Sequence, residues 1–156
     1  MAFASHPAAL HALGVRGVVN LCDEFRGPVR LYAELGMHEL WLPTIDHHEP
    51  SLAALQAAVK FIRRFKDQNQ KVYVHCKAGH GRSAAVAFCW LFTQHHSDME
   101  MASIARFMES KRKVRKDLHM QPSVSMFCEE HTKEITITIK REDMLPLTHS
   151  PSAQAS

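Results

Sequence analysis

The segment spanning residues 71–92, KVYVHCKAGHGRSAAVAFCWLF, restricts the possible folds more than any other part of the chain. Its first six residues include Val72, Tyr73 and Val74, which are types common in strands, and this predicts a short strand over 71–76. Residues 84–92 are apolar on every side, which predicts a helix that is buried all round. A strand that passes through a glycine-containing loop into a buried helix is typical of α/β folds.

The rest of the chain continues this alternation of strands and helices. Apolar runs and period-two patterns predict three further strands, over 14–21, 37–43 and 134–140 (EITITIK). Capping signals and helical periodicity predict four further helices, over 6–13, 51–66 with Ser51 as its cap, 97–108 with a Ser97–Glu100 capping box, and 121–131. We therefore expect an α/β domain in which helices flank a central, mostly parallel sheet.

Composition narrows the class of protein. The length of 156 residues suits one domain, which we expect over 1–144, followed by a disordered tail over 145–156. A net charge of +3 is too small for a nucleic-acid-binding surface, so no nucleic-acid partner is expected. No apolar run approaches the ~20 residues of a transmembrane segment, and the start, MAFASHPAAL, has the features of neither a secretory signal nor an Arg- and Ser-rich presequence.

The cysteines indicate the compartment. Four cysteines are scattered along the chain without a C-x-x-C pair, which argues against a structural zinc site and against a disulfide framework. This usage fits a reducing, intracellular compartment such as the cytoplasm. A disulfide between Cys22 and Cys76 under oxidation is one interpretation of Cys22, and a packed core cysteine is the more common one.

The loop at 76–83, CKAGHGRS, has the composition of a phosphate-binding site. Gly79 and Gly81 permit the backbone to turn several N–H groups toward one anion at the start of a helix. Arg82 opens that helix, and its planar fork can hold two phosphate oxygens. Cys76, placed over these groups, should have a lowered pKa and exist as a thiolate. The residues predict phosphoryl transfer to Cys76 through a phosphocysteine intermediate.

The sequence HCKAGHGRS resembles the signature H-C-x-x-G-x-x-R-[ST] of the cysteine-dependent protein tyrosine phosphatase superfamily, in its dual-specificity branch. This resemblance implies that Cys76 is the nucleophile and Arg82 the phosphate clamp. It also implies that Ser83 helps the thiolate to leave in the second step, and that His75 orients the cysteine from behind. The resemblance implies a phosphate cradle made of Lys77, Ala78, Gly79, His80, Gly81 and Arg82.

Hydrolysis also needs a general acid, which then acts as a base. Asp46, in WLPTIDHHEP, follows one predicted strand and precedes a helix, 30 positions before Cys76. Dual-specificity phosphatases carry their acid on such a loop at about this distance, which favours Asp46. The rival candidates are Glu49 on the same loop and the pair Asp23 and Glu24. The adjacent residues 47 and 48 are histidines, but no spaced partner completes a metal site, and the expected mechanism needs no cofactor.

The substrate class rests on the loop side chains. Lys77 and His80 are expected at the rim of the pocket, where cationic groups favour substrates with additional negative charge. The motif CKAG-x-GR-[ST] and the order of the flanking segments resemble lipid-directed members, especially the mitochondrial phosphatidylglycerophosphate phosphatase branch. A phosphorylated lipid is therefore the expected substrate. The basic residues 111–116 offer a contact with an anionic lipid surface or with the substrate, although a solvated helix end that complements the helix dipole is the more common interpretation of such a run. A phosphoprotein substrate, or an inactive module that only binds phosphate, remains the alternative.

Two expectations concern the surroundings of the site. The loop CDEFRGP at 22–28 either borders the pocket, with Phe25 as a wall, or is a polar connection that turns at Gly27. Relatives carry strands before the segment that matches the first predicted strand. We therefore expect a sheet that lacks N-terminal strands and exposes an edge, which residues 134–140 would cover.

Overall fold

Three parallel strands form the sheet of the computed structural model, which describes residues 6–95 and 99–143. The strands are β1 (Val15–Cys22), β2 (His38–Thr44) and β3 (Lys71–His75), and β1 lies between the other two. Because the three strands are parallel, their carboxyl ends meet at one edge of the sheet, where α/β folds bind ligands. The expected α/β fold with a parallel sheet and flanking helices is confirmed.

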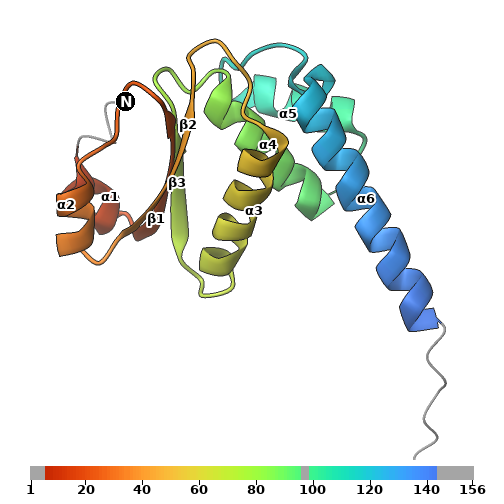
Figure 1. Ribbon diagram of the computed structural model, residues 1–156, viewed down its shortest axis with the longest axis horizontal. Coiled ribbons are helices and arrows are strands. Elements are labelled where there is room, and N and C mark those ends of the chain that lie inside the picture. The colour runs from red at the N-terminus through yellow and green to blue at the C-terminus, as the bar shows by residue number, and fades with distance from the viewer. Residues whose placement is uncertain (1–5, 96–98, 144–156) are drawn as a thin grey trace, which may run out of the picture.

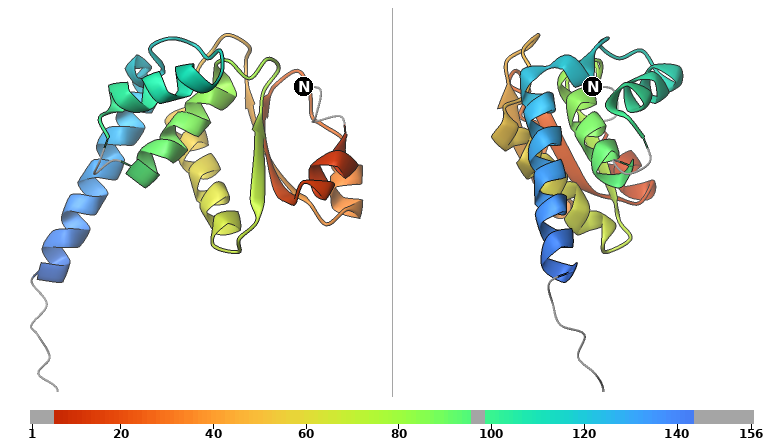
Figure 2. Two further views of the ribbon diagram at one scale, coloured as in Figure 1. Left: turned by 180° about the vertical axis from the view of Figure 1, so that it is seen from behind. Right: turned by 90° about the vertical axis from the view of Figure 1, so that its right-hand side faces the viewer.

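Helices lie on both sides of the sheet (Figure 1). On one side are the short helices α1 (Pro7–Ala12) and α2 (Val29–Glu34). The other side carries α3 (Leu52–Lys66), α4 (Arg82–His95), α5 (Met101–Lys111), the 3-10 helix η1 (Leu118–Met120) and α6 (Pro122–Asp143). The front view (Figure 1) and the rear view (Figure 2, left) both show α4 on this side of the sheet among the other helices, and it contacts α3, α5 and α6. This enclosure explains why its sequence is apolar on all sides.

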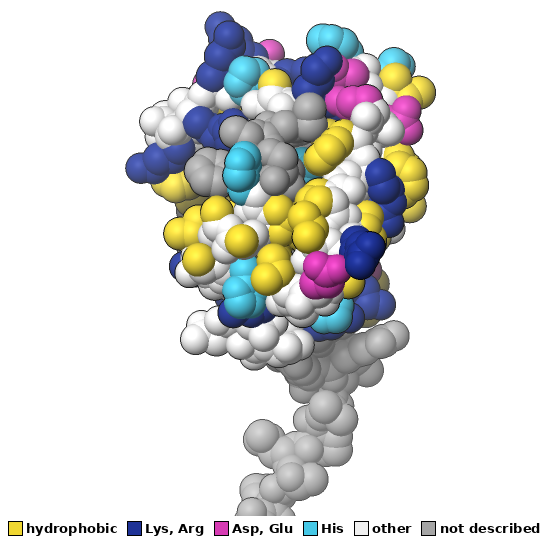
Figure 3. All heavy atoms as spheres, turned by 90° about the vertical axis from the view of Figure 1, so that its left-hand side faces the viewer, with side chains coloured by type: hydrophobic (Ala, Val, Ile, Leu, Met, Phe, Trp, Pro, Cys, Tyr) yellow, Lys and Arg dark blue, Asp and Glu magenta, His cyan; other side chains and the backbone are white. Residues whose placement is uncertain are grey.

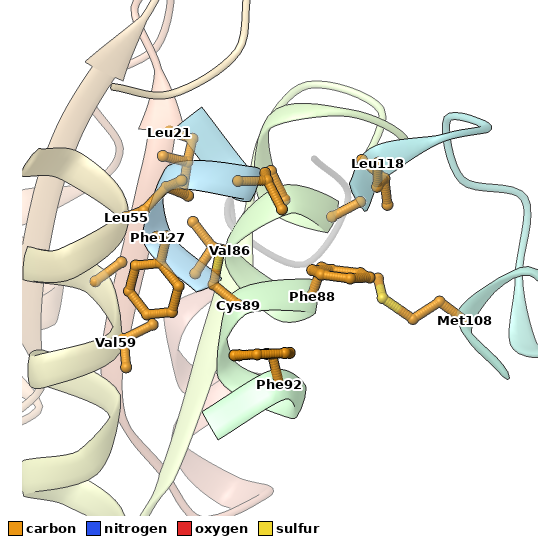
Figure 4. Close-up of a cluster of buried hydrophobic side chains, with 14 of the residues drawn as sticks. Leu21, Leu55, Val59, Val86, Phe88, Cys89, Phe92, Met108, Leu118 and Phe127 are labelled. Atoms are coloured by element: carbon orange, nitrogen blue, oxygen red, sulfur yellow. The ribbon is translucent and has the colours of Figure 1, made fainter. Parts of the chain in front are cut away.

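The alternation of side chains along β1 divides the core into two parts. Val18 packs with residues of α1 and α2 in a small cluster, whereas Val19 packs in the larger cluster on the side of α3 and α4. Figure 4 shows this larger cluster, in which Phe127 of α6 lies between the side chains of α3 and α4. The members that it labels are Leu21, Leu55, Val59, Val86, Phe88, Cys89, Phe92, Met108, Leu118 and Phe127.

The start of α3 agrees with the sequence prediction, whereas the residue predicted to cap the helix α5 lies outside the described residues. The Ser51 hydroxyl accepts a hydrogen bond from the Ala54 N–H over 3.2 Å, so Ser51 caps α3 as predicted. Helix α5 has Glu100 at its N-terminal cap position. The predicted cap Ser97 and the predicted tail over 145–156 lie outside the described residues.

The prediction of a strand over 134–140 is wrong, because these residues continue α6. The helix begins at Pro122 and is anchored by Val124, Phe127 and Cys128 in the core, and helix extension from such an anchor is cooperative. The threonines fit this helix because their hydroxyls donate to carbonyls four residues earlier, as Thr136 does to Thr132 over 2.9 Å. The segment therefore lies on the α3 side of the fold and does not cover an edge of the sheet (Figure 1).

Within the described residues, each outer strand of this sheet has one edge without a strand partner. Among the residues that the structure describes, β3 pairs only with β1, as does β2. An apolar hollow of about 1000 Å³ runs along β3 and is lined mainly by hydrophobic side chains of α1, β3 and α4, among them Leu10, Val72 and Trp90. The face that carries α1 and α2 also shows gathered hydrophobic side chains (Figure 3). Within the described ranges no helix has the length and apolar content needed to cross a membrane.

Candidate active site

The loop at 76–81 joins the carboxyl end of β3 to the first turn of α4 and encloses the Cys76 thiol. The Gly79 N–H donates to Cys76 Sγ over 3.2 Å, and Ser83 Oγ lies 3.2 Å from the same sulfur. Gly79 has φ of +75°, a left-handed conformation that favours glycine. A cavity of about 340 Å³ opens above the sulfur. It is lined by Asp46, His47, His48, Cys76, Lys77, Ala78, His80, Gly81, Arg82 and Arg115.

These contacts give Cys76 a different acidity from the other cysteines. Burial raises the pKa of the Cys76 thiol, but hydrogen bonds from Ser83 and Gly79 and the charge of Arg82 outweigh it, so the pKa is lowered. Burial instead raises the pKa of Cys22 to about 11 and that of Cys128 to about 12, and it also raises the pKa of Cys89. Cys76 is therefore the cysteine best able to form a thiolate, and all four cysteines are free.

Arg82 is buried at the floor of the cavity and is held from two sides. Its Nη1 and Nη2 donate to the two carboxylate oxygens of Glu24, each over 2.9 Å. Nη1 also donates to the Thr44 carbonyl over 2.7 Å, and Nη2 to Asp46 Oδ1 over 2.9 Å. The hydrogen bonds from Arg82 lower the pKa of Glu24 to about 2, and Glu24 in turn raises the pKa of Arg82. The guanidinium is therefore fixed in orientation and permanently charged.

Asp46 lies two residues beyond β2 and reaches the same cavity as Cys76. One carboxylate oxygen accepts hydrogen bonds from Arg82 Nη2 and, over 3.0 Å, from the His47 N–H. The other oxygen is 3.8 Å from Lys77 Nζ. The structure thus brings Asp46 to Arg82 and to the loop at 76–81 (the phosphate loop), and its role as general acid stays a prediction.

The rival acids occupy other positions. Glu49 accepts a hydrogen bond from the Ser123 N–H over 3.3 Å, at the start of α6, and does not line the cavity. Asp23 is exposed and is also absent from the lining. Glu24 is engaged by Arg82 through both of its oxygens, so its position suits the support of the arginine rather than proton transfer.

A buried asparagine holds the turn that carries Glu24. The Asn20 side chain accepts a hydrogen bond from the Cys22 N–H over 2.9 Å and donates to the Phe25 carbonyl over 2.8 Å. It also donates to Glu39 over 3.1 Å. Phe25 packs against the main core and does not line the cavity, so the expectation that it forms a wall of the pocket is wrong. Gly27, with φ of +84°, closes the connection as a turn.

His75 lies directly before the nucleophile, buried at the end of β3. Its ring stacks on Tyr73 with 5.4 Å between ring centroids. Burial lowers the pKa of His75 to about 4, and the nearby Cys76 backbone opposes this shift only weakly, so the imidazole is neutral near pH 7. A neutral ring in this position can pack behind the loop but adds no positive charge to the thiolate.

Sequence reasoning missed two arginines that follow α5. The Arg115 N–H donates to the His80 carbonyl over 2.6 Å, and Arg115 Nη2 donates to the His47 carbonyl over 3.2 Å. A Cβ atom placed on Gly79 would lie 2.6 Å from Arg112 Nη2, so this guanidinium rests directly against the phosphate loop. The signal in the sequence was the basic run at 111–116, but only the fold shows that it returns to the site.

Comparisons with known proteins agree with this geometry. The family model described as dual specificity phosphatase, catalytic domain, matches residues 2–136. The chain is 35% identical over 127 residues to the phosphatidylglycerophosphate phosphatase PTPMT2 of Arabidopsis thaliana, covering 80% of this chain and 54% of the relative. It is 33% identical over 128 residues to the phosphatidylglycerophosphatase and protein-tyrosine phosphatase 1 of Mus musculus, covering 78% of this chain and 64% of the relative. The chain thus spans between half and two thirds of the length of these relatives.

Solved structures with a similar fold include those of a phosphatase related to the relatives just named. The crystal structure of PTPMT1 superposes with a TM-score of 0.66 at 28% identity, covering 88% of this chain and 89% of that chain. The structure of PTPMT1 in complex with PI(5)P superposes with a TM-score of 0.65 at 26% identity, covering 88% of each chain.

Proposed function

Since the chain belongs to the dual specificity phosphatase family, we propose that it hydrolyses phosphomonoesters through a phosphocysteine intermediate. The observation that carries this proposal is the environment of Cys76. Its sulfur is held by the Gly79 N–H and the Ser83 hydroxyl in a cavity that also contains Arg82 and Asp46. We assign this activity to a domain over residues 1–144.

In the first step the Cys76 thiolate attacks the phosphorus atom. A sulfur–phosphorus bond forms as the ester phosphorus–oxygen bond breaks, and Asp46 gives its proton to the leaving oxygen. The loop N–H groups between Lys77 and Arg82 and the N-terminus of α4 bind the equatorial oxygens, where negative charge accumulates. In this proposal His75 packs behind the loop and orients Cys76.

In the second step a water molecule attacks the phosphocysteine. The Asp46 carboxylate takes a proton from the water, a new phosphorus–oxygen bond forms, and the sulfur–phosphorus bond breaks. The Ser83 hydroxyl, 3.2 Å from the sulfur, donates a hydrogen bond to the departing thiolate and so favours this bond cleavage.

Arg82 links phosphate binding to the release of Asp46. Glu24 and the Thr44 carbonyl occupy three of the four Nη hydrogens, and Asp46 accepts from the fourth. Of the described residues, none accepts a hydrogen bond from Nε. A phosphate that binds side-on through Nε and Nη2 therefore displaces Asp46 from Nη2, which frees the carboxyl group to reach the leaving oxygen.

We propose a phospholipid with a phosphomonoester headgroup as the substrate. The names of the relatives and of the PI(5)P complex support this class, as do the cationic residues at the rim of the cavity. Such a substrate is reached at a membrane surface, so peripheral membrane contact near the basic residues 111–116 is part of the proposal. A reactive thiolate also requires a reducing compartment, and we propose the cytoplasm or the mitochondrion, which subcellular fractionation would distinguish.

Phosphate release from phosphatidylglycerophosphate and PI(5)P in mixed micelles, compared with a phosphotyrosine peptide, tests this proposal. We expect turnover of the lipids, and loss of turnover with retained vanadate binding in Cys76→Ser. Preference for the peptide would leave the chemistry in place and exclude the lipid assignment. Stabilisation by vanadate without any turnover would identify a phosphate-binding module instead.

A further inference from the structure

The segment between α5 and η1 folds back to the phosphate loop and brings two guanidinium groups to it, that of Arg115 in the lining of the cavity and that of Arg112 against Gly79. Arg115 is fixed by its backbone N–H on the His80 carbonyl and by its side chain on the His47 carbonyl, so it connects the two loops that carry Cys76 and Asp46. Arg112 rests on Gly79 from the same segment. The two guanidinium groups therefore lie against the loop that would hold the reacting phosphate.

These two arginines differ from Arg82 in how their positive charge is compensated by carboxylates. Arg82 is paired with Glu24 and Asp46, which compensate its charge. Neither Arg112 nor Arg115 forms an ion pair with a carboxylate of the described part of the chain. Both are exposed and carry an uncompensated positive charge; Arg115 lines the cavity, and Arg112 lies beside it against Gly79 of the loop that encloses the cavity.

We propose that Arg112 and Arg115 form a second anion subsite, which binds a phosphodiester group on the same substrate molecule as the reacting phosphomonoester. This inference rests on the proposed function and names the part of the substrate that the phosphate loop does not contact. A guanidinium binds a phosphate through two parallel hydrogen bonds, and a phosphodiester oxygen pair offers this geometry. The subsite thus favours a headgroup with two phosphates over one with a single phosphate.

A pair of soluble substrates isolates the second phosphate. Glycerophosphoglycerol phosphate carries a phosphomonoester on glycerol and a phosphodiester, whereas glycerol 3-phosphate carries the phosphomonoester alone. We expect a higher kcat/KM for the first compound. In Arg112→Gln and Arg115→Gln we expect the ratio of the two kcat/KM values to fall by about 10-fold, the effect of one charged hydrogen-bonded contact at an exposed position.

Matched control variants distinguish a direct contact with the substrate from a general effect of positive charge and from structural support of the two loops. Lys113→Gln and Lys116→Gln remove the same charge from exposed neighbours in the same segment and should leave the ratio unchanged. Arg115→Lys keeps the charge but cannot keep both the contact with the His47 carbonyl and a bidentate phosphate contact. We expect it to retain an intermediate ratio, whereas a ratio as low as that of Arg115→Gln with a lowered melting temperature would show that Arg115 only joins the two loops.

A binding measurement separates this inference from the proposed function. In Cys76→Ser we expect glycerophosphoglycerol phosphate to bind more tightly than glycerol 3-phosphate, and the added change Arg112→Gln to remove about 10-fold of that affinity. Selective binding without turnover in the wild type would overturn the hydrolytic function and keep the subsite. Equal kcat/KM and equal affinity for both compounds would overturn the subsite alone. A dependence on Arg112 and Arg115 that appears only with anionic vesicles would also overturn it, since the second anion would then come from neighbouring lipids.

Discussion

The carboxylate of Glu24 and the guanidinium of Arg82 meet through two parallel hydrogen bonds of 2.9 Å, at the floor of the cavity that contains Cys76. The two residues come from different elements, Glu24 from the turn after β1 and Arg82 from the first turn of α4. Their pairing leaves the other side of the guanidinium facing Asp46 and the cavity. We therefore propose that Glu24 is a positioning residue, which holds the Arg82 guanidinium in its orientation.

We expect Glu24→Gln to lower kcat/KM by roughly 10-fold or more, because an amide replaces a charged acceptor and can accept only one of the two hydrogen bonds. The measurement is steady-state turnover together with vanadate affinity, and both should fall because Arg82 binds the anion. Asp23→Asn makes the same change of charge on the exposed neighbour and should have little effect. Equal losses in the two variants would show that charge alone, and not the position of Glu24, matters.

Asp46→Asn should slow hydrolysis of an alkyl phosphate by roughly 10²–10⁴-fold, the range for loss of a general acid. The loss should be smaller for an aryl phosphate with an acidic leaving group, because that oxygen needs less protonation. Glu49→Gln alters the rival acid on the same loop and should keep nearly full activity. Full activity of Asp46→Asn on the alkyl substrate would contradict the assignment.

Ser83→Ala should slow the second chemical step by roughly 10²-fold, since it removes one hydrogen-bond donor to the departing thiolate. A rapid-quench experiment should then show a burst of the first product and accumulation of the phosphocysteine. The same variant should raise the pKa of Cys76, because the Ser83 hydrogen bonds help to lower it. The pH profile of thiol alkylation would detect this, with Ser110→Ala on the exposed face of α5 as a control. Unchanged burst kinetics would exclude this role of Ser83.

His75 predicts a dependence of stability on pH. Its pKa is about 4 in the folded protein and 6.5 in the unfolded chain, so the unfolded chain binds more protons between these values. The stabilisation is complete above about pH 6.5 and is lost as the pH falls toward 4, with a total of about 3 kcal/mol. Denaturation by urea at a series of pH values should show this loss in the wild type and in His38→Gln, an exposed control. A loss of the same size in His75→Gln would assign it to other groups.

The sequence predicted the parts of the molecule that local chemistry determines. Ser51 caps its helix because a hydroxyl at this position satisfies a free N–H. The loop at 76–83 encloses Cys76 because glycines and a helix start leave few other conformations. The family resemblance selected the loop that carries Asp46, and parallel strand order brings that loop to the cavity above Cys76.

What could not be predicted depends on contacts between distant segments. EITITIK has the alternation of a strand, but a core-anchored helix already runs through it, and no periodicity within seven residues reveals that anchor. Glu24 was weighed as an acid because the sequence does not show that a residue 58 positions later takes both of its oxygens. From the sequence alone, Arg112 and Arg115 are interpreted as part of a solvated helix end. Only the fold shows that their segment returns to the loop at 76–81.

The turn that carries Glu24 is held by the side chain of Asn20, a neutral amide that does not titrate in the physiological pH range. Two of its hydrogen bonds end on backbone groups, the Cys22 N–H and the Phe25 carbonyl, which do not titrate either. The anchoring of this turn through those two bonds thus stays the same at every pH at which a thiol, a carboxyl group or an imidazole changes its charge. A step in a rate profile recorded against pH should therefore not come from the release of this turn from those two backbone groups.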